Sequence, residues 1–474
     1  MAGMAENPLD LLPEVLLAAS AVGGLLLGCW LPRARQWPVA ALGCGAAAAG
    51  IAAAALQPPG PAFGGAFVVD GVTSASRVVV LGGLLVVLAL SVRPLAAHPR
   101  QSEHAVLLQL SSLGALLLAG SADLLLLAAA YLLASVPSYV LAGFGKDAAG
   151  TEAAMKYYVV GAVLGIVMLG GIVLLYAAAR GVGYPALRAE LPGGPLALAT
   201  GGVVAVSAGL LFKAGGVPGH FWVPDAVQGS AAPVAAFLTT VPKVAALAAL
   251  YRLGAEAVAG AGVPWAALVA VVSAASMTLG NLAAFFQQDV RRLLAYSTIS
   301  QVGYLLLPVA VVGRTELAQP ALLFYLAAYA LTNLGAFAVV CALPGLRTID
   351  AYRGLGRHSP ALAGALAVCL LGLVGTPPTA VFLGKVTAFS AAVDGGFAWL
   401  AVVSAANTVA SLFYYLRWIA PTVAVPRAAG AGPLVPAPAP ALVRSAAVIA
   451  YAAAAGSVVL GVAGGPVLAL LETP

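Results

Sequence analysis

Three lysines lie inside apolar stretches that are each long enough to cross a bilayer: Lys213, Lys243 and Lys385. They are unusual because only 8% of the residues in this chain are charged. An ammonium group at the centre of a membrane costs at least about 2.5 kcal/mol, and ionisable residues there usually mark ion or proton pathways. Loss of water favours the neutral amine, which lets a lysine bind and release protons near neutral pH. The three lysines therefore indicate proton transfer, the alternative being lysines that merely extend to the membrane surface.

The stretches around these lysines define the class of protein. Of the 474 residues, 62% are hydrophobic, and the apolar runs repeat at a length of about 20 residues, which crosses a hydrocarbon core of about 30 Å. The runs are continuous and do not alternate with a period of two, which excludes a membrane β-barrel. Basic residues are then topology signals and not a nucleic-acid surface. The sequence predicts an all-α polytopic membrane protein.

A window of about 19 residues predicts about fourteen membrane spans. They cover residues 10–31, 38–56, 78–94, 104–120, 122–144, 156–180, 196–225, 231–253, 264–286, 291–312, 319–342, 361–393, 396–420 and 443–469. If the N-terminus lies outside, most of the 22 lysines and arginines fall on the inner side, as cytoplasmic loops require. We therefore expect a multi-pass membrane protein with both termini on the outer side. The high alanine, glycine and proline content suggests a bacterial source, so the membrane would be the bacterial cell membrane.

Two of the predicted spans are interrupted in the same way. The seventh span reads LLFKAGGVPGHFWVPDA, with Pro218 after Lys213, and the twelfth reads LLGLVGTPPTAVFLGKVTAF, with Pro377 before Lys385. Proline removes a backbone donor and clashes with the preceding turn, so each helix should be broken near the membrane centre. Matching breaks predict two inverted repeats of five helices around a transport path, although two independent proline kinks would give the same pattern.

The predicted organisation has four parts. Residues 1–103 hold the first three helices, residues 104–253 the first repeat, residues 254–420 the second repeat, and residues 421–474 a loop and the last helix. Each repeat contains one of the broken helices. A transport path would then run between the two breaks.

A second group of residues is polar but mostly uncharged and recurs at helical spacing. It consists of Tyr296, Ser297, Ser300, Gln301 and Tyr304 on the tenth span, and Tyr325, Tyr329, Thr332 and Asn333 on the eleventh. These side chains could order water between Lys243 and Lys385, or they could be ordinary hydrogen bonds between helices. His220 lies in the seventh span beside its break, where it could relay protons or simply pack.

Residues for redox chemistry are missing from the sequence. The four cysteines have no CxxC spacing, and the chain has neither a glycine-rich nucleotide motif nor a spaced histidine pair. We therefore expect no cofactor and no metal on this chain.

Four ordered segments resemble a known family. They are FKAGGVPGHFWVPDAVQGSAAPVAAFLTTVPKVAALAALYRL from Phe212, RRLLAYSTISQVGYLLL from Arg291, GTPPTAVFLGKVTAF from Gly375 and NTVASLFYYLRW from Asn407. These segments resemble the antiporter-like membrane subunits of respiratory complex I, and most of all its subunit N. The resemblance covers residues 10–420. It supports the count of fourteen spans with two inverted repeats.

The resemblance implies a role for each lysine. Lys213 is the lysine of the broken seventh helix, Lys243 that of the eighth, and Lys385 that of the broken twelfth. In the family these lysines form an axis along the membrane centre that is proposed to pass protons in response to quinone reduction. NADH, FMN, iron–sulfur clusters and quinone would be bound by partner subunits, so this chain would be a proton-translocating part of an NADH:quinone oxidoreductase. The alternatives are a subunit of a multi-component cation/proton antiporter and a divergent subunit with an impaired proton path.

Two positions depart from the family pattern. The family usually has a glutamate in the fifth helix, five residues before a proline, where it pairs with the lysine of the seventh helix. Here the residue five positions before Pro137 is Leu132, and Gln301 stands where the family often has histidine. Without a nearby anion, desolvation should leave Lys213 less often charged.

Overall fold

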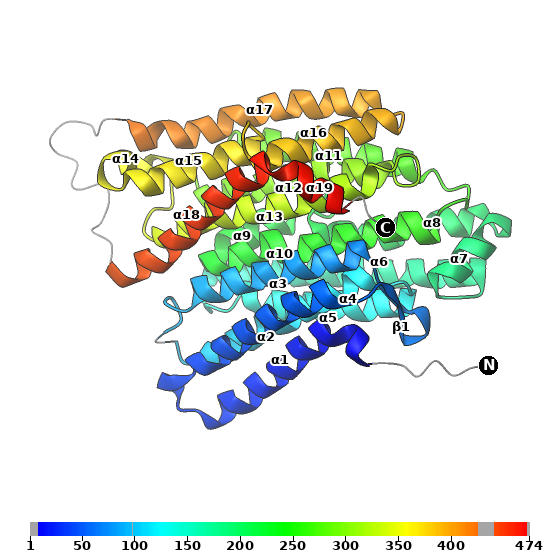
Figure 1. Ribbon diagram of the computed structural model, residues 1–474, viewed down its shortest axis with the longest axis horizontal. Coiled ribbons are helices and arrows are strands. Elements are labelled where there is room, and N and C mark those ends of the chain that lie inside the picture. Colours follow the sequence, from blue (N-terminus) through cyan, green and yellow to red (C-terminus); the bar gives the residue numbers. More distant parts are fainter. Residues whose placement is uncertain (1–7, 97, 425–439, 472–474) are drawn as a thin grey trace.

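The computed structural model describes residues 8–96, 98–424 and 440–471. Nearly all of them form long helices that run side by side along the long axis of the molecule (Figure 1). Three helices come first: α1 (Leu12–Trp30), α2 (Trp37–Leu56) and α3 (Gly71–Ser91). A small antiparallel hairpin of β1 (Gly60–Ala62) and β2 (Phe67–Val69) joins α2 to α3.

The next helices form the two repeats. The first contains α4 (Gln101–Gly120), α5 (Leu124–Ala142), α6 (Ala148–Ala179), α8 (Leu196–Ala214), α9 (Trp222–Gly229) and α10 (Ala232–Arg252), with α7 (Tyr184–Glu190) in a loop. The second contains α11 (Trp265–Ala284), α12 (Val290–Ala310), α13 (Ala318–Ala342), α15 (Pro360–Val374), α16 (Ala380–Asp394) and α17 (Ala398–Val423), with α14 (Leu355–His358) in a loop. The chain continues with α18 (Pro440–Val462) and α19 (Gly464–Leu471).

The expected number of spans is confirmed. Among the described residues, 13 helices are long and apolar enough to cross a membrane. The predicted twelfth span is the pair of shorter helices α15 and α16, which meet at the expected break. The first turn of α1 and the end of α19 lie at the same end of the bundle, as an even number of spans requires (Figure 1).

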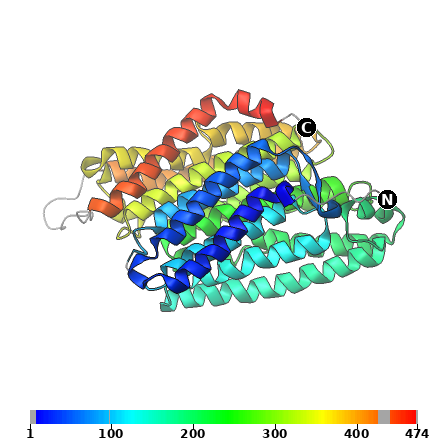
Figure 2. The same ribbon diagram turned by 60° about the horizontal axis from the view of Figure 1, so that its bottom comes forward.

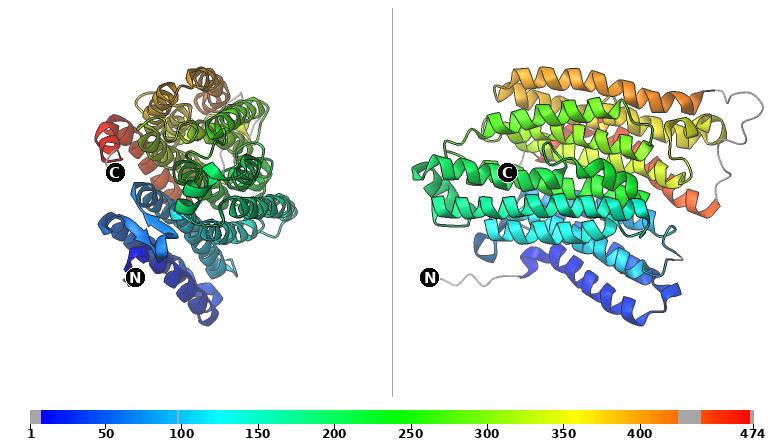
Figure 3. Two further views of the ribbon diagram at one scale, coloured as in Figure 1. Left: turned by 90° about the vertical axis from the view of Figure 1, so that its right-hand side faces the viewer. Right: turned by 180° about the vertical axis from the view of Figure 1, so that it is seen from behind.

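Viewed along the helices, the N-terminal three helices form a flank beside the two repeats (Figure 3, left). Figure 2 shows the same flank from another side, with α1 and α2 crossing in front of the bundle. The ends of α4 and α10 meet, because Arg252 Nε donates to Ala119 O at 3.3 Å. The first repeat therefore finishes at the end of the bundle where α4 finishes, so α11 begins there and the second repeat is inverted.

Close helix contacts recur in both repeats. A Cβ placed on Gly114 of α4 would lie 2.2 Å from the backbone nitrogen of Ala134 on α5, and one placed on Gly280 of α11 would lie 2.5 Å from that of Ser300 on α12. In lipid, where apolar burial drives association weakly, such small residues allow the backbone contact that holds helices together. The two glycines thus bring together the first two helices of each repeat.

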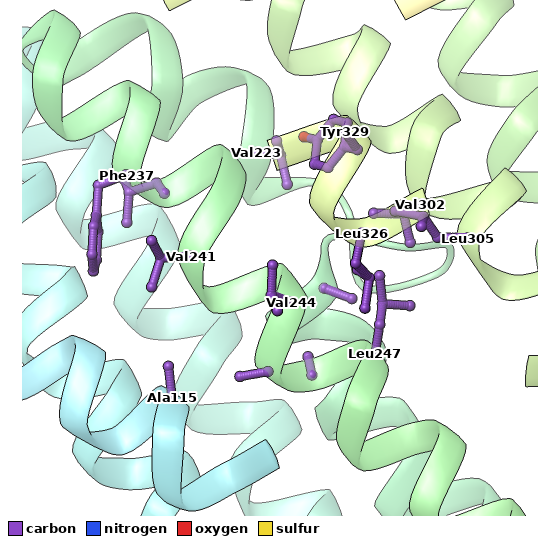
Figure 4. Packing of buried hydrophobic residues seen from close by; sticks show 14 of the residues in the cluster. Ala115, Val223, Phe237, Val241, Val244, Leu247, Val302, Leu305, Leu326 and Tyr329 are labelled. Atoms are coloured by element: carbon purple, nitrogen blue, oxygen red, sulfur yellow. The ribbon is translucent and has the colours of Figure 1, made fainter. Parts of the chain in front are cut away.

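The core lies around α10, α12 and α13, whose side chains are almost all buried. Figure 4 shows Val241, Val244 and Leu247 on successive turns of α10, in one apolar cluster with Val302 of α12 and Leu326 of α13. The lysine-bearing α10 is therefore packed between the two repeats. Its position allows it to couple them.

Two predicted helix starts were wrong, for one physical reason. The third helix begins at Gly71 and the sixth at Ala148, each about seven residues before the hydropathy window placed it. Asp70 and Asp147 cap these helices, with the carboxylates accepting from the amides of Thr73 and Gly150. A capping aspartate starts a helix in polar sequence that an apolar window ignores.

The earlier start of α3 places Arg77, which directly precedes the predicted span 78–94, inside the helix. Arg77 is fully buried and forms an ion pair with the equally buried Glu14 of α1 at 2.8 Å. We expect Glu14→Gln to destabilise the folded protein by about 3–5 kcal/mol, because it leaves a buried guanidinium without its anion. Thermal unfolding of the purified protein measures this, and the double variant Glu14→Leu with Arg77→Leu should recover most of the loss.

Candidate functional site: buried lysines at two helix breaks

The first break has a lysine at its end. Helix α8 ends at Ala214, and Gly215 follows in the left-handed conformation with φ of 75°. Lys243, from the middle of α10, is fully buried and donates from Nζ to Ala214 O at 2.5 Å. A Cβ on Gly215 would lie 2.6 Å from this Nζ, so the glycine leaves room for the lysine. The ammonium group thus lies at the negative end of the α8 dipole.

The second break repeats this arrangement with a lysine from another helix. Helix α15 ends at Val374, Gly375 follows with φ of 86°, and Lys385 of α16 donates from Nζ to Val374 O at 2.9 Å. The same Nζ lies 3.2 Å from Thr408 Oγ1 and 3.8 Å from the centre of the Tyr304 ring. In each repeat, therefore, a lysine caps the carboxyl end of the first half of the broken helix.

Lys213 lies in the last turn of α8 among hydroxyl groups. Its Nζ donates to Ala134 O at 2.7 Å and to Ser135 Oγ at 3.1 Å, both on α5. Ala134 O also accepts from Ser111 and Ser138, each at 2.8 Å. We call Ser111, Ser135 and Ser138 the serine cage. The serine cage was not predicted from the sequence, although Ser135 and Ser138 flank Pro137.

The part of the chain that the structure describes places no anion beside these lysines. Within the described ranges, no carboxylate oxygen lies within 4 Å of the Nζ of Lys213, Lys243 or Lys385. Leu132, which stands at the position of the expected glutamate, is 50% exposed, whereas the Ser135 side chain is buried. A carbonyl and a hydroxyl therefore replace the carboxylate beside Lys213.

Two groups of hydrogen-bonded polar side chains are present, one beside the turn before Lys243 and one beside the carbonyl that Lys385 caps. Tyr329 of α13 donates to Thr239 O at 2.6 Å, one turn before Lys243, and its hydroxyl oxygen lies 3.1 Å from Thr298 Oγ1 of α12. One turn away on α13, Tyr325 donates to Gln301 Oε1 at 2.7 Å. Gln301 Nε2 in turn donates to Leu373 O at 2.7 Å, next to the carbonyl that Lys385 caps.

Asn333 belongs to the group beside the turn before Lys243. Its Nδ2 donates to Thr239 Oγ1 at 3.0 Å and to Thr240 Oγ1 at 2.9 Å. The hydrogen bonds thus include three threonines that were not expected from the sequence: Thr239, Thr240 and Thr298. Their hydroxyls are hard to recognise in sequence, because threonine in a membrane helix commonly bonds its own backbone.

Known proteins match the chain over this whole region. The family described as "NADH:quinone oxidoreductase/Mrp antiporter, TM" matches residues 121–411. The "NADH-quinone oxidoreductase subunit N 1" of Streptomyces griseus is 53% identical over 424 residues, which are 88% of this chain and 90% of the relative. The "NADH-quinone oxidoreductase subunit N" of Mycobacterium sp. strain JLS is 50% identical over 470 residues, covering 98% and 99% of the two chains.

The chain belongs to the NADH-quinone oxidoreductase subunit N family. Among solved structures, respiratory complex I from Thermus thermophilus contains a similar chain, with a TM-score of 0.83, 33% identity and coverage of 97% and 99%. A chain of the Mrp complex from Dietzia sp. DQ12-45-1b shares the fold, with a TM-score of 0.82, 22% identity and coverage of 98% and 97%. The family and the fold expected from the four segments are confirmed.

Four of the candidate residues lie outside the two groups of polar side chains between Lys243 and Lys385 in this member of the subunit N family. Thr332 pairs with Ser457 of α18 at 3.0 Å, and Ser297 forms a short hydrogen bond with Tyr415 of α17. Tyr296 lies under the Arg292 guanidinium, 5.8 Å from it. His220 lies in the loop between α8 and α9, with its ring 4.3 Å from that of Phe221. The polar side chains between Lys243 and Lys385 that form these hydrogen bonds therefore come from α10, α12 and α13.

The second half of the broken seventh helix is anchored by charges near one end of the bundle. Asp225 of α9 accepts from Arg292 of α12 at 2.7 Å and from Lys156 of α6 at 3.0 Å. These two ion pairs link α9 to α6 and to α12.

Proposed function

We propose that this chain is a membrane-arm subunit of a bacterial NADH-quinone oxidoreductase and that it translocates protons when other subunits oxidise NADH and reduce quinone. The observation that supports this proposal is the set of three buried lysines, two of which cap the broken helices. FMN, iron–sulfur clusters and quinone would lie on the partner subunits. The chain would span the bacterial cell membrane many times with both termini outside, and the other membrane-arm subunits would be its partners.

The capped helix ends explain how a proton could be held without a carboxylate. A helix dipole places roughly half a negative charge at its carboxyl end. At Ala214 O and Val374 O this partial charge stabilises an ammonium group less than a full anion would. The carbonyl and hydroxyl acceptors also accept from a neutral amine, so Lys243 and Lys385 keep their hydrogen bonds after losing a proton.

Tyr325, Tyr329 and Thr298 carry hydroxyl groups that can donate and accept, which suits them to relay a proton between these lysines. Gln301 cannot titrate. In the proposal it orients Tyr325 by accepting its hydrogen bond.

The experiment that tests the proposal uses the purified assembly in sealed vesicles. Addition of NADH and a quinone should acidify the side opposite to the NADH-binding face, as reported by a pH-sensitive dye. The assembly should contain the other oxidoreductase subunits. Co-purification with antiporter subunits, together with sodium-dependent proton movement that needs no NADH, would favour a cation/proton antiporter instead.

A third candidate is a divergent subunit whose proton path has lost efficiency, and the serine cage allows a test. We expect Ser135→Asp to slow proton translocation about tenfold, because an anion this close to Lys213 favours its charged form by roughly one to three powers of ten. Ser135→Asn is the uncharged control and should change the rate little. A gain in protons moved per NADH with Ser135→Asp would instead favour the impaired subunit.

A further inference from the structure

A cavity of about 1010 Å³ opens between α1 and α4 at the end of the bundle that holds the α1–α2 loop. Its lining residues do not include Lys213, Lys243 or Lys385. Its floor is the contact of the two helices, where a Cβ on Gly28 would lie 2.7 Å from Ser102 Oγ. At the same place, Oε1 of Gln36 accepts a hydrogen bond from the Ser102 hydroxyl at 3.0 Å.

The cavity has an apolar wall and a basic rim. The wall is formed by Leu25 of α1 and by Val106, Leu107 and Leu110 of α4. The rim carries Arg33, Arg100 and Lys146, from three different loops, against the single acid Glu103. Arg100 is fixed in place, since its Nη2 donates to Phe144 O at 2.6 Å and its guanidinium lies 4.5 Å from the Phe144 ring centre. Three cations therefore surround the mouth of an apolar groove.

The rim lies at the membrane surface. Trp30 and Trp37, at the end of α1 and the start of α2, are 92% and 63% exposed. Exposed tryptophans of this kind mark the level of the lipid headgroups. From Arg100 to Leu110 the groove extends about 15 Å along α4, at roughly 1.5 Å per residue, which takes it well into the hydrocarbon.

We propose that this groove binds one anionic phospholipid, with its phosphate at the rim between Arg33, Arg100 and Lys146 and an acyl chain along Leu25 and Leu110. A lipid fits both halves of the site, because basic pockets between membrane helices bind acidic headgroups and the wall continues into the exposed apolar face of α1. An inserted peptide would leave backbone donors unpaired at that depth. The proposal does not depend on the proton path.

The test compares lipid retention by the purified assembly. A triple variant, Arg33→Gln, Arg100→Gln and Lys146→Gln, should bind cardiolipin about 100-fold more weakly, since each basic residue near the surface contributes roughly a fivefold factor. The matched control carries the same charge change elsewhere: Arg93→Gln, Arg353→Gln and Arg357→Gln. Native mass spectrometry in detergent doped with cardiolipin or phosphatidylcholine measures the bound lipid.

A second variant tests the proposal even if the triple variant does not fold. Glu103→Gln removes the one acid of the rim and should strengthen cardiolipin binding about fivefold. Equal binding of phosphatidylcholine and cardiolipin, or equal loss in the triple variant and its control, would overturn the proposal. So would cross-linking that finds a segment of a partner subunit in the groove.

Discussion

Replacing Lys243 with methionine is expected to lower proton translocation at least about tenfold. Methionine has a similar length and flexibility, so it fills the space next to Gly215, but it cannot carry a proton. The change also leaves Ala214 O, at the end of α8, without its donor. Lys243 should be the most sensitive of the three lysines because α10 packs against helices of both repeats.

The measurement is the ratio of protons moved to NADH oxidised in sealed vesicles. Arg93→Met provides the control, since its side chain is exposed in the loop between α3 and α4 and lies outside the lysine axis. Lys243→Arg should also lower the number of protons moved per NADH oxidised. A guanidinium stays charged at every pH of interest, and its larger head does not fit beside Gly215. Normal translocation by Lys243→Met would exclude a proton path through this residue.

The lysines and the breaks could be predicted because each violates a strong rule. A cation in lipid and a proline inside a membrane helix stand out in sequence, so Lys213, Lys385 and Pro218 were found without a structure. The partners of the lysines were not predictable. Ala134 O and Ala214 O are backbone atoms, and any residue could supply them. Which carbonyl a lysine reaches depends on how two helices pack.

The serine cage is a second example of lysine partners that could not be predicted from the sequence. Leu132 stands where the family usually has a carboxylate, and from this we predicted a Lys213 without a nearby anion. Lys213 is in fact surrounded by acceptors on the neighbouring face of α5. Polar helix residues can be placed on a face by their period of 3.6, but the rotation of that face toward α8 is set by tertiary packing.

Substituting valine for Gly461 should damage both stability and proton translocation. Gly461 lies on α18 against the second break, where an added Cβ would be 2.1 Å from Pro378 O and 2.5 Å from the carbonyl carbon of Thr379. These are backbone atoms, so no rotamer change relieves the clash. We expect a loss of about 1–3 kcal/mol in the free energy of unfolding, the usual cost of overpacking. Gly82→Val in α3 is the control, because nothing lies within 4 Å of its Cβ position.

We expect Gly461→Val to lower proton translocation because the contact between α18 and the second break positions the start of α16. Pro378 and Thr379 directly precede α16, so pushing them away also moves Lys385 relative to Val374 O and the Tyr304 ring. Ser457→Ala separates the two effects, since it removes the hydrogen bond from α18 to Thr332 without adding bulk. That variant should lower the unfolding temperature slightly and leave the protons moved per NADH unchanged. If Gly461→Val also kept this ratio, α18 would serve only to hold the bundle together, and the geometry of the second break would not depend on it.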